Sequence, residues 1–203
     1  RSVRAILQPG DTLMIGNLSL LKYVRLRTDE VQHHVQLYES VALDVLTGAL
    51  NRRSIDTRLA SEWSYACRHD LDMSVMIMDV DGFARVNDLF GNEGGDEVLR
   101  DLARIIRSEI RGEDVFGRRG GEEFLVASLG VGHRGAVKLA KRLRKTIART
   151  SFAVGKSKAK VTVSIGVATY HGSKSHWPEE LVGLASARLA KAKSSGGNRE
   201  VTS

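Results

Sequence analysis

Two groups of acidic residues are the positions in this sequence best suited to chemistry. One, Asp79-Val80-Asp81, ends the apolar run 74–78, and the other, Glu122-Glu123, follows the pair Gly120-Gly121. The apolar runs 74–78 and 124–127 have the length and composition of buried strands. Because glycine accepts positive φ, the glycine pair predicts a tight turn immediately before the second strand.

If these two strands are neighbours, Asp79 and Glu122 lie at the same edge of a sheet. Magnesium in proteins is commonly held by one or two carboxylates together with the phosphate oxygens of a substrate. The two acidic groups therefore predict a site for metal-assisted phosphoryl transfer. For the glycine turn by itself, the commoner alternative is a solvated hairpin that carries two glutamates.

Further motifs accompany the two acidic groups. They are Asp44-Val45-Leu46-Thr47-Gly48-Ala49-Leu50-Asn51-Arg52-Arg53, Gly82-Phe83 after the first acids, Asn87-Asp88, Gly95-Asp96, Arg118 before the glycine pair, and Val163-Ser164-Ile165-Gly166-Val167. In order and spacing, residues 44 to about 200 resemble the GGDEF domain, the catalytic domain of diguanylate cyclases. The resemblance implies that two GTP molecules, held by two facing domains of a homodimer, are joined into cyclic di-GMP with release of pyrophosphate.

The resemblance also implies roles for the acidic residues. Asp79 and Glu122 would bind the metal, with Val80 contributing its backbone carbonyl, and Glu123 would complete the catalytic acidic site. Glutamate in place of the name-giving aspartate at position 122 is a common variant that keeps the carboxylate. The expected cofactor is Mg²⁺, two ions per active site, with Mn²⁺ as a substitute.

Base selection is expected to rest on Asn87 and Asp96. Guanine presents an N1–H and an amino group as donors, so a carboxylate suits it and leaves adenine poorly matched. Asp96 could equally be a carboxylate stabilised at a helix N-terminus, which is compatible with the same role. Arg118 is expected either to support the acidic turn or to bind a phosphate.

The side expected to bind the triphosphate departs from the family pattern. Ala84 stands where a phosphate-contacting lysine is usual, and only the neighbouring Arg85 could compensate for it. In the closing motif, Lys193 remains as a triphosphate ligand, while the usual aspartate, tyrosine and arginine are replaced by Ser186, Ala190 and Gly197, and Arg199 comes two places late. Losing two charged hydrogen bonds would weaken GTP binding by roughly tens to a thousandfold. The sequence thus predicts an active but weak cyclase.

The segment Arg111-Gly112-Glu113-Asp114 matches the RxxD product-inhibition motif of the family in type and spacing. Arginine can fork onto guanine O6 and N7, and a nearby carboxylate can accept from the N1–H edge. Arg111 and Asp114 are therefore assigned to an inhibitory cyclic di-GMP site, although such a tetrapeptide alone could be a surface ion pair.

Two other functions compete with the enzyme. One is a catalytically weakened domain that serves as a cyclic di-GMP receptor, and the other is a signalling scaffold that depends on the N-terminal region. A pure receptor has no need to keep Asp79, Glu122 and Glu123 together, and this favours the enzyme.

The N-terminal residues 1–28 have the alternating pattern of short strands. The stretch from Leu7 to Tyr23 resembles the C-terminal strands of a truncated forkhead-associated (FHA) domain, which implies a phosphoprotein partner. An ordinary hairpin is the alternative. Residues 29–43 are expected to form a linker helix, whose stripe of Val31, Val35, Tyr38 and Ala42 packs on its own domain or on a second protomer.

For residues 44–203 the sequence predicts an α+β fold of the ferredoxin-like, polymerase-palm type, a sheet with helices on one face. Helices are expected from Asn51 to Arg68, from Asp96 to about Ile110, from Arg134 to Arg149 and from Pro178 to Ala192. Strands are expected near 74–79, 114–118, 123–129 and 161–169, with a hairpin loop at 155–160.

Composition indicates the cell compartment and the classes of partner to expect. Hydrophobic residues make up 42% of the 203 residues, enough for a core, and no apolar run approaches the ~18 residues of a membrane span. The single cysteine, Cys67, is interpreted as a small core residue in a reducing cytoplasm. The net charge of +7 suits phosphorylated small molecules. With 5% aromatics and basic residues spread among the helices, neither a nucleic acid nor a membrane is expected as a partner.

Overall fold

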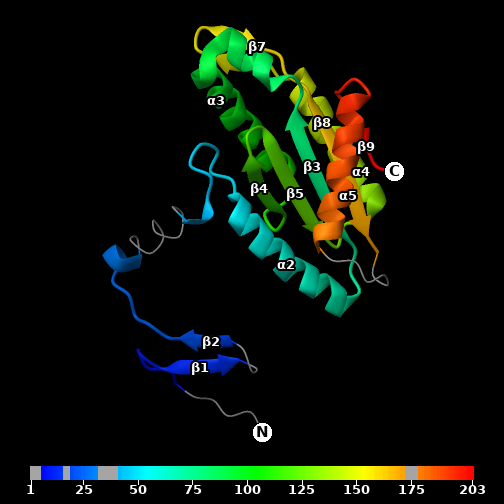
Figure 1. The fold of residues 1–203 in the computed structure, drawn as a ribbon. Helices are drawn as coiled ribbons and strands as arrows, with labels where there is room; N and C mark the ends of the chain where they lie inside the picture. Colours follow the sequence, from blue (N-terminus) through cyan, green and yellow to red (C-terminus); the bar gives the residue numbers. More distant parts are fainter. Residues whose placement is uncertain (1–5, 16–18, 32–40, 172–177) are drawn as a thin grey trace. The chain divides into compact units, whose positions relative to one another are not determined.

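The computed structural model describes residues 6–15, 19–31, 41–171 and 178–203 (Figure 1). The chain divides into two units, Arg1–Val41 and Ala42–Ser203. In the smaller unit, β1 (Thr12–Ile15) and β2 (Ser19–Lys22) form an antiparallel hairpin. Of the expected linker helix, residues 28–31 and 41–42 are helical, while 32–40, with Val35 and Tyr38, lie outside the described residues.

The larger unit is built on a five-stranded sheet with the order β4-β5-β3-β8-β9. The strands are β3 (Met73–Val80), β4 (Val115–Gly120), β5 (Glu123–Leu129), β8 (Val163–Tyr170) and β9 (Glu200–Val201). All neighbouring strands are antiparallel except β8 and β9. The central strand β3 is buried along almost its whole length, so its end is held firmly in place.

Helices cover both faces of this sheet, which corrects the expectation of one covered face. On one face, α2 (Arg52–His69) and α5 (Pro178–Ser194) pack on the β3 side chains Val75 and Ile77. On the other, α3 (Phe83–Glu109) and α4 (His133–Arg149) pack on Met76, Met78 and Val80. A strand that is apolar on both of its faces is typical of a sheet buried on both sides, and β3 follows that rule.

The helix α3 begins earlier than expected and bends. It starts at Phe83 rather than Asp96 and continues to Glu109 across a kink at Gly91, which has φ 71° and ψ 172°. A side chain at Gly95 would place its Cβ 1.9 Å from the Asn87 amide oxygen, so a larger residue would have to displace Asn87 from this position. The glycines therefore shape the helix instead of delaying its start.

The remaining elements follow the sequence closely. Asn51 caps α2 by accepting a hydrogen bond from the Ser54 N–H at 3.0 Å. Strands β6 (Phe152–Val154) and β7 (Ser157–Ala159) form a hairpin, so the expected loop at 155–160 is shorter than predicted and most of that range is strand β7. Cys67 is exposed, 3.9 Å from the Tyr170 hydroxyl, so its interpretation as a core residue was wrong.

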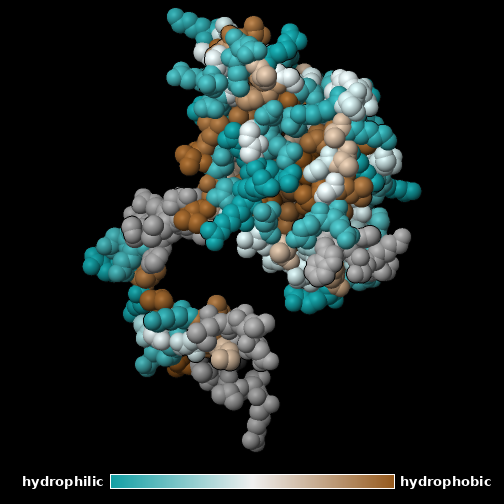
Figure 2. Space-filling model, viewed as in Figure 1, coloured by the Kyte–Doolittle hydropathy of each residue, from teal (hydrophilic) through white to brown (hydrophobic). Residues whose placement is uncertain are grey.

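The surface of the larger unit is mostly hydrophilic on the face seen in Figure 2, with apolar side chains between the polar ones. Val45 and Leu89 are among its most exposed large apolar residues. Within the described ranges, no helix combines the length and the apolar character that a bilayer crossing requires.

Candidate active site

The two acidic groups meet at one end of β3 and β5. These strands are antiparallel neighbours, and Asp79 stands directly opposite Glu123 in the register. Glu122 occupies the preceding turn, where Gly120 and Gly121 have φ values of 141° and 51°. The two strands are thus neighbours, as a shared acidic edge required, and the turn depends on the positive φ that glycine accepts.

Asp79 is the most perturbed carboxyl group of this edge. Its side chain is 13% exposed, and Oδ1 lies 2.6 Å from Lys193 Nζ in an ion pair. No described donor makes a well-aligned hydrogen bond to this buried oxygen. Burial raises the pKa of Asp79 to about 6; the ammonium of Lys193 opposes that change, and the charges of Glu122 and Glu123 add to it.

The acidic edge fits a divalent cation that brings ligands of its own. No group of three or more acidic, histidine or cysteine side chains within the described residues is close enough to hold an ion unaided. Magnesium, however, takes one or two carboxylates and completes its shell with phosphate oxygens, carbonyl groups and water. The poorly satisfied oxygen of Asp79 supplies one such ligand, and Glu122 is near enough to act on its charge. Val80, the last residue of β3, places its carbonyl at the same strand end.

Glu123 has a partner of its own. The guanidinium of Arg119 forms an ion pair with its carboxylate, and both side chains are largely buried. Arg119 belongs to none of the motifs recognised in the sequence, although an arginine four residues before an acid, across a two-glycine turn, is a signal for such a pair. The charge of Glu123 is thus partly balanced by the protein itself.

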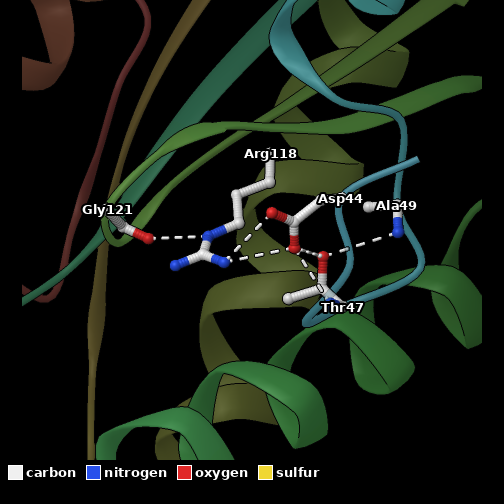
Figure 3. A network of polar contacts seen from close by, with 5 residues as sticks. All are labelled: Asp44, Thr47, Ala49, Arg118 and Gly121. Carbon is white, nitrogen blue, oxygen red and sulfur yellow. Dashed lines mark hydrogen bonds and ion pairs between the residues drawn. The ribbon is translucent and has the colours of Figure 1, made fainter. Parts of the chain in front are cut away.

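Arg118 holds the acidic turn to the start of the domain (Figure 3). Its Nε donates to the Gly121 carbonyl at 2.8 Å, and its Nη1 donates to the Asp44 carboxylate at 3.1 and 3.2 Å. Asp44 also accepts from the backbone N–H and the hydroxyl of Thr47 at 2.9 and 2.6 Å. The guanidinium is thus bonded to protein groups. Of the two roles expected for Arg118, this arrangement supports the acidic turn and does not point to a phosphate.

Asp44 received no role from the sequence, yet it anchors this network. Burial alone would raise the pKa of Asp44, but the hydrogen bonds from Thr47 and Arg118 outweigh it and hold that pKa below its usual value. An aspartate three residues before a threonine is a common turn signature, and it could have indicated the anchor.

Asn87 and Asp96 lie on opposite sides of the kink in α3. Asn87 rests against Gly95, the residue before Asp96, because the Gly91 kink folds the first part of the helix towards the second. Both side chains are partly exposed. An amide and a carboxylate with these neighbours can offer acceptors to a purine edge that carries two donors.

The side that the sequence assigns to the triphosphate carries few charges. Ala84 and Arg85 are on the first turn of α3, and no ion pair involves Arg85 in the described part of the chain. Gly197 has φ 70°, and a Cβ there would lie 3.0 Å from the Asp81 carboxylate. Arg199 donates from Nε to the Gly197 carbonyl at 3.2 Å, so it serves its own turn. Lys193 pairs with Asp79 at the acidic edge.

Arg111 and Asp114 form a turn on the surface before β4. Asp114 accepts a hydrogen bond from the Arg111 backbone N–H at 2.8 Å. The Arg111 guanidinium is 67% exposed and lies 4.0 Å from Glu113, a distance that contributes little in water. The side chain is therefore available to a ligand.

Comparison with known families identifies the larger unit. Residues 41–199 match the family model described as "Diguanylate cyclase, GGDEF domain". The chain therefore belongs to the GGDEF family.

Among curated proteins, the chain is similar to diguanylate cyclase DosC of Escherichia coli, at 31% identity over 97% of this chain and 41% of DosC. It is also similar to the response regulator PleD of Caulobacter vibrioides, at 34% identity over 89% of this chain and 39% of PleD. The chain thus spans about two fifths of the length of these relatives.

Solved structures agree with the fold. Diguanylate cyclase SiaD of Pseudomonas aeruginosa, solved with its activator SiaC, has a TM-score of 0.76 and 33% identity, covering 86% of this chain and 67% of SiaD. The active GGEEF domain of a diguanylate cyclase from Vibrio cholerae has a TM-score of 0.70 and 30% identity, covering 75% of this chain and 96% of that domain. These likenesses support the α+β assignment.

Proposed function

We propose that residues 42–203 act as a diguanylate cyclase that condenses two GTP molecules into cyclic di-GMP and releases pyrophosphate. The observation that carries the proposal is the convergence of Asp79 with Glu122 and Glu123 at one end of neighbouring strands. A partly buried group of carboxylates destabilises itself, so a fold that retains one has a use for it, and a cation with a triphosphate supplies the missing positive charge.

One group of residues would bind the triphosphate of GTP, and another would bind its guanine base. Asp79, Glu122 and the Val80 carbonyl would hold Mg²⁺ or Mn²⁺, and the bound metal would neutralise charge on the triphosphate. Asn87 and Asp96 would select guanine, and Lys193 would leave Asp79 to pair with a phosphate. Because one domain binds one GTP in this scheme, the reaction needs a homodimer with facing sites.

The altered phosphate side sets the expected rate. An alanine at position 84 and a glycine at position 197 remove two cationic contacts, and Arg199 is held by its own turn. We therefore propose a cyclase with a high KM for GTP and retained metal chemistry.

The test is turnover of GTP by the whole chain. Protein, GTP and MgCl₂ are incubated, and nucleotides are separated by chromatography. Cyclic di-GMP is expected with GTP and not with ATP, and it should be lost with EDTA. Absence of product at millimolar GTP, with dimeric protein confirmed by light scattering, would refute the activity.

We further propose that cyclic di-GMP inhibits the enzyme by binding at Arg111 and Asp114. The exposed guanidinium can fork onto a guanine, and Asp114 offers a carboxylate three residues away. Inhibition that persists unchanged in Arg111→Ala would contradict this assignment.

A receptor for cyclic di-GMP is the second candidate function. The depleted phosphate side and the accessible Arg111 favour it, because ligand binding at the surface turn needs none of the catalytic groups. Separate titrations with cyclic di-GMP and with GTP plus Mg²⁺ distinguish the two. A receptor binds only the first, whereas an enzyme binds both and turns GTP over.

Residues 1–43 precede the GGDEF domain and are expected to have a separate role. We propose that residues 1–28 end an FHA-like domain that binds a phosphoprotein, that residues 29–43 link it to the GGDEF domain, and that the protein acts in the cytoplasm. The hairpin of β1 and β2 is compatible with this proposal and also with a simple hairpin. Binding of phosphothreonine peptides by the full-length protein would separate the two.

A further inference from the structure

The second aspartate of the Asp79-Val80-Asp81 motif has a different environment from the first. Asp81 Oδ1 accepts a hydrogen bond from the Ser164 hydroxyl at 2.6 Å. Its Oδ2 accepts from the Thr162 hydroxyl at 2.7 Å and from the Asn198 backbone N–H at 2.8 Å. Both oxygens are therefore engaged by the protein, whereas Asp79 has an oxygen without an aligned donor among the described residues. Two carboxylates two positions apart are thus prepared for different tasks.

Asn198, whose backbone N–H donates to Asp81, is also contacted by a side chain of α4. Arg144 donates from Nη1 to the side-chain oxygen of Asn198 at 3.0 Å and from Nε to Glu200 at 2.6 Å. The Arg144 and Glu200 side chains are 18% and 14% exposed, so solvent screens this contact little. Asn198 itself has φ 47°, a left-handed conformation that asparagine tolerates better than most residues.

These contacts fix the turn that follows α5. The Gly196 N–H donates to the Lys193 carbonyl at 3.1 Å, and the Gly197 N–H donates to the Ala192 carbonyl at 3.2 Å. The turn then leads through Asn198 into β9, which pairs with β8. Lys193, whose ammonium lies 2.6 Å from Asp79, stands at the other end of the same turn.

We propose that Asp81, Asn198 and Arg144 form a clamp that positions Lys193 at the acidic edge, and that Asp81 is a positioning residue and not a metal ligand. The inference rests on the proposed cyclase function, because Lys193 matters there as a contact for the triphosphate. Because the side assigned to the triphosphate has few charges, the clamp matters by holding Lys193 in place there. Neither Arg144 nor Glu200 belongs to a motif recognised in the sequence.

The clamp itself can be tested without nucleotide or metal. Hydrogen exchange of backbone amides in residues 194–201 is measured by mass spectrometry on the full chain. Arg144→Ala should speed this exchange by at least about tenfold, since it removes two charge-assisted hydrogen bonds. Lys145→Ala, a neighbour on the same helix, is the matched control and should leave it unchanged.

Asn198→Gly is the second variant, because glycine keeps the left-handed backbone and removes only the Arg144 contact. It should speed exchange less than Arg144→Ala does, because the contact between Arg144 and Glu200 remains, and the double variant should add little to Arg144→Ala alone. Wild-type exchange in both single variants, with folding confirmed by circular dichroism, would overturn the clamp whatever the activity of the protein.

Steady-state kinetics test the link to Lys193. Arg144→Ala should raise KM for GTP about tenfold with kcat changed less than about threefold, since a displaced Lys193 weakens ground-state and transition-state binding alike. A fall in kcat alone would contradict the positioning of Lys193. If wild type makes no cyclic di-GMP, the proposed function fails, and the exchange experiment still decides on the clamp.

Asp81→Asn separates positioning from metal binding. An asparagine can still accept from the Asn198 N–H with its oxygen and donate to the Ser164 hydroxyl with its amide. The half-saturating Mg²⁺ concentration should therefore change less than about threefold, and Asp79→Asn should raise it about tenfold or more. Equal increases in the two variants would show Asp81 to be a metal ligand and overturn the proposal.

Discussion

The acidic edge and the Arg111–Asp114 turn are both charged regions assigned to a guanine nucleotide, yet the fold builds them in opposite ways. The Asp79 side chain is 13% exposed, at the end of a central strand, and faces other acids. The Arg111 side chain is 67% exposed on a surface turn. One region stores unfavourable electrostatic energy before any ligand arrives, and the other is relaxed in water.

The two regions should therefore respond differently to substitution. A preorganised, partly buried site stabilises charge without reorganising, so removing one of its groups costs a large part of the effect. A solvated arginine must be ordered by its ligand, which lowers the affinity gained per contact. Substitutions at the acidic edge should therefore change the chemistry, while substitutions at the turn should change only regulation.

The largest expected effect is at Glu122. Glu122→Gln keeps the shape of the side chain and removes its charge, so kcat/KM should fall about a thousandfold, which corresponds to about 4 kcal/mol of lost stabilisation. Glu179→Gln, an exposed glutamate at the start of α5, is the control. A rate of cyclic di-GMP formation within about tenfold of wild type would mean that the acidic edge does not hold the metal.

Acid should weaken the same edge through Asp79. Its pKa of about 6 means that protons compete with Mg²⁺ for the carboxylate below that pH. The half-saturating Mg²⁺ concentration should rise about tenfold per pH unit below about 6 and level off above about 7. Mg²⁺ titrations of the initial rate from about pH 5 to about pH 8 check this, and a flat dependence would assign the metal to other groups.

Arg118 connects the acidic edge to the beginning of the domain, so its loss should affect stability as well. Arg118→Ala leaves the partly buried Asp44 without its partner and should lower the free energy of unfolding by about 2 kcal/mol, or Tm by about 4–8 °C. Arg118→Lys keeps the charge but not the fork, and should recover only part of the loss. Thermal denaturation measured by circular dichroism distinguishes the three proteins.

At the surface turn the effect should be confined to inhibition. Arg111→Ala removes a guanidinium that bears on no core residue, so Tm should stay within about 1 °C of wild type. The inhibition constant for cyclic di-GMP should rise about tenfold or more, since bidentate contacts to guanine contribute roughly 1–3 kcal/mol. Arg134→Ala, an exposed arginine of α4, controls for the loss of one positive charge.

The sequence predicted the central strands β3, β5 and β8 well because they are mostly apolar, whereas the two-residue strand β9 was not expected. The sequence could state the pairing of β3 with β5 only as a condition for bringing the acids together, because the glycine turn joins β4 to β5 and not β3 to β5. The start of α3 could not be predicted in the same way, because Gly91, Gly94 and Gly95 weaken a helical pattern whose bend becomes favourable only when Asn87 packs on Gly95.

Site residues inside one motif were easier to find than contacts between distant segments. Asp79 and Lys193 lie far apart along the chain, and both were named separately, but their ion pair was not foreseen. Asp44 with Arg118, and Arg144 with Glu200, likewise join separate elements. A single sequence records which charges exist, and only the fold determines which of them meet.

The weakest change in kinetics is expected on the side assigned to the triphosphate. Ala84→Lys adds a cation on the exposed first turn of α3, where the resemblance to the family implies one. KM for GTP should fall severalfold, corresponding to about 1 kcal/mol for a solvated charge contact. Ala84→Met adds similar length without charge and should not help. If lysine and methionine have the same effect, the gain comes from packing. Arg85→Ala is then compared in the wild type and in the Ala84→Lys variant. If it raises KM for GTP only in the wild type, Arg85 contacts the phosphates, as the sequence suggested. Arg85 would then supply part of the positive charge that Ala84 and Gly197 do not.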